Sequence, residues 1–397
     1  MLGKVAIVGQ GYVGLPLALA ACNSGFKVVG IDINVEKVRN LNLGISGIEG
    51  IDDFNLSKLV ELGSYLATNE FKAVSTCEVI VICVPTPLDY DNKPDMSAID
   101  LAIASISQFL KKGSLVILES TVQPGTTRNY LVPKVENESG IHRDDLYVAF
   151  SPERIDPLNK VWTITNTPKI VSGLTKEALE KTVKFYSKFI DNVITVESLE
   201  IAETSKLLEN SFRLINISFV NELSLFCYKL GISIDHVIEA AATKPYGFMP
   251  FYPGLGVGGH CIPIDPIYLL HKAKEVGAHL DLIEIAAKVN NQMADSFVSR
   301  AENMIGNLSG KRILILGVSY KPNLADTRET PSHKLIEGLV AKGAIVDWHD
   351  EIVKVWNNSH SVQISTEYDL AIIATLHDNM NLDGLGNVPI INTRDSV

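Results

Sequence analysis

The stretch that decides the fold is KVAIVGQGYVG, at residues 4–14. Its first half is a continuous apolar run, which is typical of a buried parallel strand. Its second half is a G-x-G-x-x-G pattern, which predicts a tight turn that opens a helix. A second apolar run follows at residues 27–31 and ends at Asp32. Strand, glycine turn, helix and strand in this order predict a doubly wound α/β sheet.

Each glycine of this pattern has its own expected task. Gly9 makes the turn, Gly11 lets a pyrophosphate approach the backbone, and Gly14 lets helix and strand pack closely. The phosphates would then lie at the helix N-terminus. Asp32 follows the pattern by about 20 residues and can accept hydrogen bonds from both ribose hydroxyls. This favours NAD over its 2′-phosphorylated form.

Two further strands, at residues 79–84 and 115–119, each end in a polar loop. The first loop carries Thr86 and the second carries Thr121. Because ligands of open α/β sheets bind at the carboxyl ends of the strands, we expect both threonines near the nicotinamide half of the cofactor. Ordinary turn roles are the alternative.

A third polar loop follows a strand predicted at residues 146–150 and reads SPERID. Glu153 beside Arg154 could form a surface ion pair. Their place at the carboxyl end of a strand favours a role in a binding or active site.

Residues 198–231 predict one long helix, which ends at Gly231. It is apolar on most faces, so we expect it to be buried, between domains or between the subunits of a homodimer. Lys206, Asn210 and Arg213 lie on one face, at spacings of four and three. A solvated charged face is the alternative. On a helix otherwise suited to burial, this polar line favours the border of an enclosed cleft.

A glycine-rich stretch, PGLGVGGHCIPIDP at residues 253–266, follows a second helix at 232–243 and an apolar, proline-interrupted loop at 244–253. Four glycines ahead of Cys261 predict a loop that brings this thiol to a ligand. A thiol whose pKa is lowered becomes a nucleophile. The alternative is a glycine-rich turn with an inert cysteine. One helical segment, at 266–303, completes the middle region.

The opening pattern recurs near the C-terminus. KRILILG at 311–317 resembles the first strand, residues 343–350 echo the second strand with its terminal aspartate, and a third strand follows at 369–374. These runs predict a second, shorter doubly wound domain. Since only Gly317 remains of the glycine pattern, a second dinucleotide is not expected there.

Lys321 and Arg328 in that domain offer cations for a different phosphate ligand. The overall prediction is an α/β protein with two Rossmann-like domains joined by a long central helix and a helical middle region. The expected domains are 1–197 (NAD binding), 198–306 (helical, with the cysteine loop and the dimer interface) and 307–397.

Composition limits the classes of partner. The 397 residues carry a net charge of −11 and no basic stripe, which argues against nucleic acid. No apolar run reaches the roughly 18 residues that a membrane span needs. The apolar stretch at 15–22 resembles a short secretory segment, but the glycine pattern accounts for it. We expect a cytoplasmic protein with no membrane partner.

The five cysteines are odd in number and widely scattered, which indicates a reducing compartment and no disulfide framework. Apart from Cys261, they lie in apolar runs and are expected in the core: Cys22, Cys77, Cys83 and Cys227. No C-x-x-C pair exists, and adjacent His260 and Cys261 would point opposite ways on an extended segment, so no metal site is expected.

Taken together, the motifs resemble the nucleotide-sugar 6-dehydrogenases, the UDP-glucose/GDP-mannose dehydrogenase family, over essentially the whole chain. The most specific pieces are GGHCIPIDP at 258–266, ESTVQPG at 119–125, SPER at 151–154 and YKPNLADTRE at 320–329. The resemblance implies a four-electron oxidation of a sugar C6 alcohol to a carboxylate with two NAD in succession. The product would feed surface polysaccharide or glycan biosynthesis.

The resemblance also implies roles for single residues. Cys261 would be the nucleophile, Lys206 the acid/base or oxyanion partner, and Asn210 a second oxyanion donor. Asp265 would position Lys206 or handle protons. Water and cofactor would be held by Thr121 and Glu153.

The implied binding residues form two sets. Those at NAD are Gly9, Gly11, Tyr12, Val13, Gly14, Asp32, Lys37, Thr86, Thr121 and Arg328. Those at the UDP-sugar are Glu153, Arg154, Ile155, Lys206, Asn210, Arg213, Phe251, Gly254, Gly258, Tyr320 and Lys321.

The loop at residues 244–254 looks like that of the N-acetylhexosamine members, UDP-N-acetylglucosamine above all, although Leu255 stands where that branch more often has proline. UDP-N-acetylmannosamine, UDP-N-acetylgalactosamine and UDP-glucose are alternative substrates. Two other classes of function are a two-electron NAD-dependent hydroxyacid or sugar-acid dehydrogenase, which has no need of Cys261, and a non-catalytic NAD-binding regulator.

Overall fold

A computed structural model describes residues 2–156 and 159–394 of the chain. The chain divides into two compact units, one up to Leu208 and one from Glu209 onward. Each unit is described by itself.

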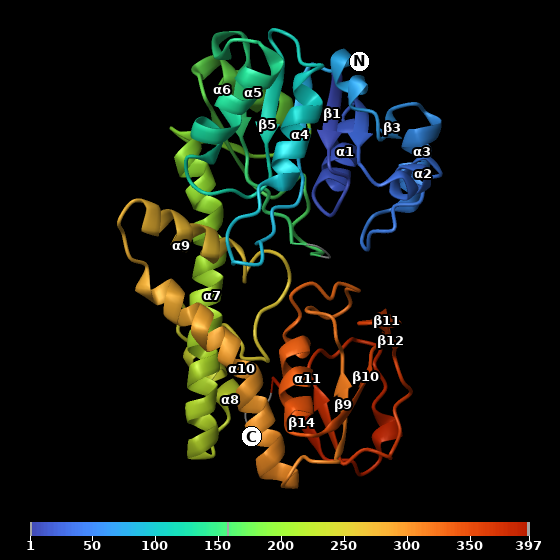
Figure 1. Ribbon diagram of the computed structural model, residues 1–397, viewed down its shortest axis with the longest axis vertical. Coiled ribbons are helices and arrows are strands. Elements are labelled where there is room, and N and C mark those ends of the chain that lie inside the picture. Colours follow the sequence, from blue (N-terminus) through green and yellow to red (C-terminus); the bar gives the residue numbers. More distant parts are fainter. Residues whose placement is uncertain (1, 157–158, 395–397) are drawn as a thin grey trace. The chain divides into compact units, whose positions relative to one another are not determined.

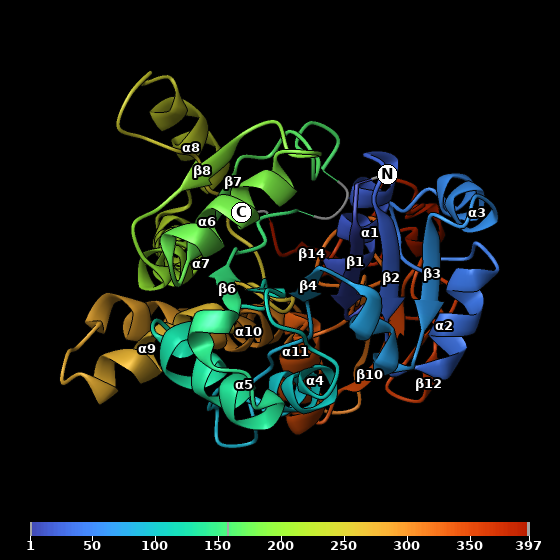
Figure 2. The same ribbon diagram turned by 90° about the horizontal axis from the view of Figure 1, so that it is seen from above.

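The first unit is built on one eight-stranded sheet, with strand order β3-β2-β1-β4-β5-β6-β7-β8 (Figures 1 and 2). The strands are β1 (Lys4–Val8), β2 (Lys27–Ile31), β3 (Tyr65–Thr68), β4 (Val79–Ile82), β5 (Leu115–Leu118), β6 (Tyr147–Phe150), β7 (Lys169–Gly173) and β8 (Val193–Thr195). The helices are α1 (Gly14–Asn23), α2 (Val35–Asn42), α3 (Asp53–Glu61), α4 (Ser97–Ser107), α5 (Val132–Ser139) and α6 (Lys176–Tyr186).

Five parallel pairings join β1 to β6, and the next strand reverses direction. β7 runs antiparallel to β6, with Phe150 opposite Ser172 and Ala149 opposite Gly173. Continuing this register by three residues brings Lys169, the first residue of β7, opposite Glu153. The reversal therefore places a residue from the start of β7 at the carboxyl ends of β5 and β6.

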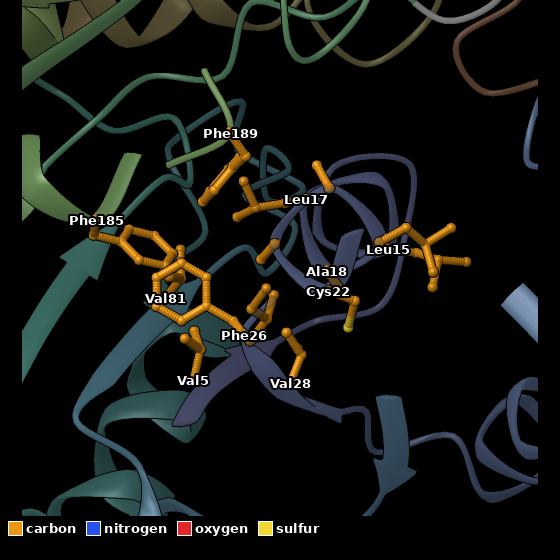
Figure 3. Packing of buried hydrophobic residues seen from close by; sticks show 14 of the residues in the cluster. Val5, Leu15, Leu17, Ala18, Cys22, Phe26, Val28, Val81, Phe185 and Phe189 are labelled. Atoms are coloured by element: carbon orange, nitrogen blue, oxygen red, sulfur yellow. The ribbon is translucent and has the colours of Figure 1, made fainter. Parts of the chain in front are cut away.

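Aromatic rings fill one side of this sheet. Phe26 packs edge-on against Phe185, with ring centroids 5.3 Å apart, and Phe185 packs in the same way on Phe189 at 5.3 Å. Figure 3 shows these rings beside the apolar face of α1 and the strands below it. They anchor α1, and with it the turn that precedes this helix, on the sheet.

The helix α7 (Leu199–Leu230) begins in the first unit and continues into the second (Figure 1). The other helices of the second unit are α8 (Ile234–Ala242), α9 (Asp265–Glu275), α10 (Asp281–Ile305) and α11 (Pro331–Ala341). Its parallel sheet has the order β10-β9-β13-β14, and β11 (Val355–Trp356) and β12 (Ser359–His360) form a separate two-stranded hairpin. The sheet strands are β9 (Arg312–Leu316), β10 (Ile345–His349), β13 (Leu370–Ile373) and β14 (Ile390–Asn392).

The predicted fold class is confirmed, with two differences in detail. The single helical segment expected at 266–303 is two helices, α9 and α10, because Gly277, the second residue after the end of α9, takes a left-handed conformation (φ 73°). The long helix is not buried all round. Leu207 and Leu214 are buried, whereas Phe219 is 62% exposed.

In the described residues, no helix combines the length and the apolar character that crossing a bilayer requires.

Candidate active site

The residues predicted at the cofactor follow neighbouring parallel strands of the first sheet. The glycine turn follows β1, Thr86 follows β4, and Thr121 follows β5. Since the carboxyl ends of parallel strands meet at one edge, these segments line the same edge of the sheet. Thr86 is buried and Thr121 is half-buried.

The three glycines of the turn have different surroundings. Gly9 has φ 93°, and a Cβ on it would lie 2.5 Å from the carbonyl oxygen of Cys83. A Cβ on Gly14 would lie 1.8 Å from the carbonyl oxygen of Gly9, whereas a Cβ on Gly11 would meet no atom within 4 Å. Only Gly11 thus borders open space, as a backbone that admits a pyrophosphate should.

Asp32 lies at the end of β2 and is only 8% exposed. Its carboxylate accepts hydrogen bonds from the backbone amides of Gln10 and Asn34, at 3.0 Å each, and from Nζ of Lys37 at 2.9 Å. The adenosine half of NAD needs a carboxylate that accepts from the ribose hydroxyls and an open backbone that the pyrophosphate can approach. Asp32 and Gly11 provide these two features. The residues of this edge therefore fit NAD.

Four other residues predicted at the cofactor have these surroundings. Lys37 is ion-paired with Asp32, and the Tyr12 hydroxyl donates to Glu49 at 2.7 Å. Val13 directly precedes α1. Arg328 belongs to the second unit, where its guanidinium binds Asp326 at 2.5 to 3.0 Å.

A buried charged cluster lies at the same edge, beyond β5 and β6. Nζ of Lys169 is 3.2 Å from Glu119 and 3.0 Å from Glu153. The other oxygen of Glu153 accepts the backbone amides of Arg154 and Ile155, at 2.6 and 2.7 Å. Glu119 accepts from two further groups of the cluster, the Tyr186 hydroxyl and the Cys83 thiol.

Lys169 and Tyr186 of this cluster were missed in the sequence. Lys169 lies in a plain apolar strand, and its approach to Glu153 depends on the reversed direction of β7. Tyr186 is the last residue of α6 and has no motif around it. Glu119 was predicted only as the first residue of the ESTVQPG motif, with no role of its own.

In the second unit, the loop that carries Cys261 is fixed at several points. Asn221 of α7 accepts the amide of Gly254 at 2.9 Å, and Asn290 of α10 accepts the amide of Val257 at 2.7 Å. The amide of Gly259 donates to the carbonyl of Arg328 at 3.0 Å. Cys261 itself is exposed. The loop is thus held by its backbone while the thiol stays accessible.

The predicted substrate residue Tyr320 packs on this loop. A Cβ on Gly258 would lie 2.8 Å from Cβ of Tyr320, and a Cβ on Gly259 would lie 2.7 Å from its ring. Only glycine leaves room for the ring at these two positions. Lys321 follows, with its carbonyl held by the Ser319 hydroxyl at 3.0 Å.

Asn210 and Asp265 are brought together as a buried pair. The Asn210 side-chain amide donates to the Asp265 carboxylate at 2.5 Å, and the two residues are 5% and 3% exposed. Asp265 begins α9, and its backbone amide donates to the carbonyl of Cys261 at 2.9 Å. A residue from the middle of α7 is therefore tied to the turn that follows the thiol. Lys206 is half-buried one turn earlier on α7.

Three other predicted substrate residues have these surroundings. Arg213 is exposed on α7. The ring of Phe251 packs edge-on against Phe212, with centroids 5.8 Å apart. In the first unit, Arg154 donates to the carbonyl of Pro168 at 2.9 Å.

The second sheet also has a tight glycine turn and an aspartate at a strand end, but the partners of this aspartate differ from those of Asp32. Gly317 has φ 82°, and a Cβ on it would lie 1.8 Å from the carbonyl of Thr375. Asp350, at the end of β10, accepts the amides of Val318, Ile352 and Val353 at 2.8 to 2.9 Å and lies 3.1 Å from His377. These contacts hold its pKa at about 2 in spite of its burial. Its oxygens are committed to the protein.

Within the described part of the chain, no group of three or more His, Cys, Asp and Glu side chains has the geometry to hold a metal ion.

Comparison with known proteins agrees with this architecture. Residues 3–190 match the NAD binding domain of the UDP-glucose/GDP-mannose dehydrogenase family, residues 200–292 match its central domain, and residues 314–388 match its UDP binding domain. The UDP-N-acetyl-D-glucosamine 6-dehydrogenase of Pseudomonas aeruginosa is 36% identical, over 97% of this chain and 93% of that protein.

Solved structures give the same result. The UDP-D-ManNAc dehydrogenase of Pyrococcus horikoshii superposes with a TM-score of 0.90 at 32% identity, covering 99% of this chain and 96% of that one. A UDP-glucose dehydrogenase from Pyrobaculum islandicum also has a TM-score of 0.90, at 25% identity, covering 99% and 94%.

The chain belongs to the UDP-glucose/GDP-mannose dehydrogenase family. It is an NAD-dependent nucleotide-sugar 6-dehydrogenase, an oxidoreductase whose substrate is a UDP-sugar.

Proposed function

We propose that the enzyme oxidises the C6 hydroxyl of a UDP-N-acetylhexosamine, UDP-N-acetylglucosamine by preference, to the uronic acid. The observation that carries this proposal is the exposed thiol of Cys261 on a loop whose backbone is held by α7, α10 and the Arg328 carbonyl. An alcohol-to-aldehyde dehydrogenase needs no such thiol. A four-electron oxidation needs a nucleophile that turns the aldehyde into a tetrahedral carbon.

The proposed chemistry starts after the alcohol has become an aldehyde. The Cys261 sulfur adds to the aldehyde carbon, and the resulting oxyanion of the thiohemiacetal accepts hydrogen bonds from Lys206 and Asn210. NAD, when bound, accepts a hydride in each of the two oxidations. The second oxidation leaves a thioester on Cys261, and water cleaves it to the carboxylate and the free thiol.

Other residues have roles in this scheme by their chemistry. Glu153 and Thr121 would hold the water that cleaves the thioester. Asp265 would keep the Asn210 amide in place. The diphosphate of the UDP-sugar would meet cations of the chain, namely Arg154, Arg213 and Lys321.

The relatives support a UDP-N-acetylhexosamine, and one loop supports the choice among these sugars. Relatives named for N-acetylglucosamine and for N-acetylmannosamine are nearly equally similar to this chain. The loop at 244–254 favours the N-acetylglucosamine branch by its resemblance. The product would serve surface polysaccharide or glycan synthesis.

A panel of UDP-sugars, with NADH counted per sugar and the product identified, tests the proposal. We expect two NADH per UDP-N-acetylglucosamine and a lower rate with the manno, galacto and gluco sugars. Cys261→Ser should stall the second oxidation while NAD affinity, measured by fluorescence titration, stays within about twofold. One NADH per sugar from the wild-type enzyme would instead support a two-electron dehydrogenase. Full acid formation by the variant would refute the nucleophile role.

We also propose that the enzyme is a homodimer through α7. Large apolar side chains form an exposed stripe along one face of this helix, at spacings of seven, four, seven and seven residues, and each is 44% to 62% exposed: Ile201, Leu208, Phe212, Phe219 and Phe226. A helix of 32 residues is about 48 Å long. Exposed apolar surface of this extent on one face is typical of an interface. The same stripe on a second copy would match it in a two-fold arrangement.

Sedimentation equilibrium at micromolar concentration tests the dimer. We expect a dimer for the wild type and a shift toward monomer for Phe219→Glu. Phe54→Glu is the matched control, because Phe54 is 79% exposed on α3, away from this stripe. A monomeric wild type would refute the proposal, as would a Phe219→Glu variant that stays fully dimeric.

A further inference from the structure

We propose that Lys169 is the positioning residue that keeps the Glu153 carboxylate charged and fixed at the cofactor edge of the first sheet. The inference rests on the proposed role of Glu153 in holding the water that cleaves the thioester. It concerns a lysine that no motif of the family resemblance contains.

The register of β7 gives Lys169 this position. Because β7 is antiparallel to β6, its first residue lies beside the segment that leaves β6. Pro168 and Lys169 hold two consecutive site residues: the Pro168 carbonyl accepts from Arg154 at 2.9 Å, and Nζ of Lys169 is 3.0 Å from Glu153. The start of one strand thus fixes the polar loop that follows its neighbour.

Because the cluster is buried, its net charge determines which of its groups can be ionised together. The side chains of Lys169, Glu119 and Glu153 are 5%, 0% and 12% exposed. Two buried carboxylates share one ammonium group, so the fully ionised cluster carries one excess negative charge. An unpaired buried charge is costly, which means that the proton affinity of each carboxylate depends on the other.

The two carboxylates accept hydrogen bonds from different sets of donors. Glu153 accepts two backbone amides in addition to Lys169, whereas Glu119 faces Lys169, the Tyr186 hydroxyl and the weak donor Cys83. Burial raises the pKa of Glu119. Burial also acts on Glu153, but Lys169 and the amides outweigh it and hold the pKa of Glu153 below its ordinary value.

This asymmetry assigns different states to the two groups. Glu119 takes up the proton when the cluster is titrated, and Glu153 remains an anion. The neighbouring thiol and phenol stay neutral, since burial raises the pKa of both Cys83 and Tyr186. Lys169 keeps its charge because Glu119 and Glu153 outweigh the cost of its burial and raise its pKa.

The pH profile of kcat for acid formation tests the inference with one variant that should move the acidic limb and one that should leave it in place. Lys169→Met removes the cation, so we expect kcat to fall at least tenfold and the acidic limb to move to higher pH. Glu119→Gln copies the protonated, neutral state of Glu119, so the acidic limb should stay in place. KM for the UDP-sugar should change less than threefold in both. Lys169→Arg should restore most of kcat.

Lys181→Met is the control, because Lys181 is an exposed lysine of α6 that lies over the Tyr147 ring, outside the cluster. An acidic limb that stays in place in Lys169→Met, or one that moves in Glu119→Gln, would overturn the inference. If Lys169→Met does not fold, the other two variants still decide. A moved acidic limb in Glu119→Gln, or a folded but inactive Lys169→Arg, rejects the inference. NADH per sugar is counted first in the wild type. A count of one rejects the proposed function, and a count of two with an unmoved limb in Lys169→Met rejects only the role of Lys169.

Discussion

Two alanine substitutions in the glycine turn should separate cofactor binding from folding. In Gly14→Ala the new Cβ would lie 1.8 Å from the carbonyl oxygen of Gly9, and Cβ atoms do not approach closer than 3.0 Å, so at least 1.2 Å (3.0 − 1.8) must be gained by backbone movement. In Gly11→Ala the new Cβ meets nothing within 4 Å, and Gly11 is not in the left-handed conformation. Gly14→Ala should therefore strain the fold, whereas Gly11→Ala should only fill the open space beside residue 11.

The magnitudes follow from these distances. Overpacking of a close contact costs about 1–3 kcal/mol, so Gly14→Ala should lower the melting temperature by about 2–12 °C. Gly11→Ala should leave stability unchanged or raise it by about 0.4–1 kcal/mol, since alanine restricts the unfolded chain. Its methyl group would keep the pyrophosphate from the backbone amides. Losing one or two charged hydrogen bonds weakens NAD binding by roughly 10- to 100-fold.

The assays are thermal denaturation without ligand and calorimetric titration with NAD, on both variants and the wild type. The expected pattern is a normal melting temperature with weak NAD binding for Gly11→Ala, and a lowered melting temperature for Gly14→Ala. A Gly11→Ala variant that binds NAD within twofold of the wild type would refute the assignment of the pyrophosphate to this turn. A Gly14→Ala variant of unchanged stability would refute the packing argument.

Three further substitutions test buried polar groups. Glu203 accepts the amides of Gly125 and Thr127, and burial raises its pKa from 4.5 to about 7. Since its folded pKa lies above the unfolded value, the free energy of unfolding should fall by up to about 3 kcal/mol as pH rises from 4.5 through 7. Glu203→Gln should flatten this dependence in urea denaturation, and a parallel curve would contradict it. Asn210→Ala removes one hydrogen-bond donor from the buried Asp265 carboxylate, so unfolding should need about 1–3 kcal/mol less, and no loss would count against this pair. Asp350→Ala should cost about 3–5 kcal/mol in the same assay with NAD affinity unchanged, and weaker NAD binding would contradict its structural role.

The sequence predicted the fold class because the strands of parallel sheets are buried on both faces and read as plain apolar runs. The run before Gly9 and its echo before Gly317 became β1 and β9. β7 could not be predicted in this way, because a strand that reverses direction has the same composition as one that does not. The partners of Glu153 were missed for that reason.

The loop around Cys261 shows a second limit. Its glycine density predicted a close backbone approach, and the structure shows which neighbour approaches Gly258 and Gly259, namely Tyr320. Residues 61 and 62 positions apart in the chain cannot be paired from one sequence without a structural reason. The helix break at Gly277 was also missed, because apolar periodicity continues on both sides of it.

The long helix was predicted to be buried because apolar residues occur on most of its faces. In the single chain one face is packed and the face with Phe212, Phe219 and Phe226 is exposed. The periodicity of the sequence shows that a helix face is apolar. It does not show whether the same chain or a second copy covers that face. The dimer therefore stays a prediction until it is measured.

The contacts that Asp350 makes within the protein have a consequence for protein engineering. Replacing the residues after Gly317 by glycines, to copy the first turn, would not create a second nucleotide cofactor site. Like Asp32, the acidic group that would have to bind a ribose accepts two loop amides, but it is also completely buried, accepts a third amide from Val353 and lies against His377. A redesign would first have to supply new acceptors for those amides, and only then could the carboxylate be released to a ligand.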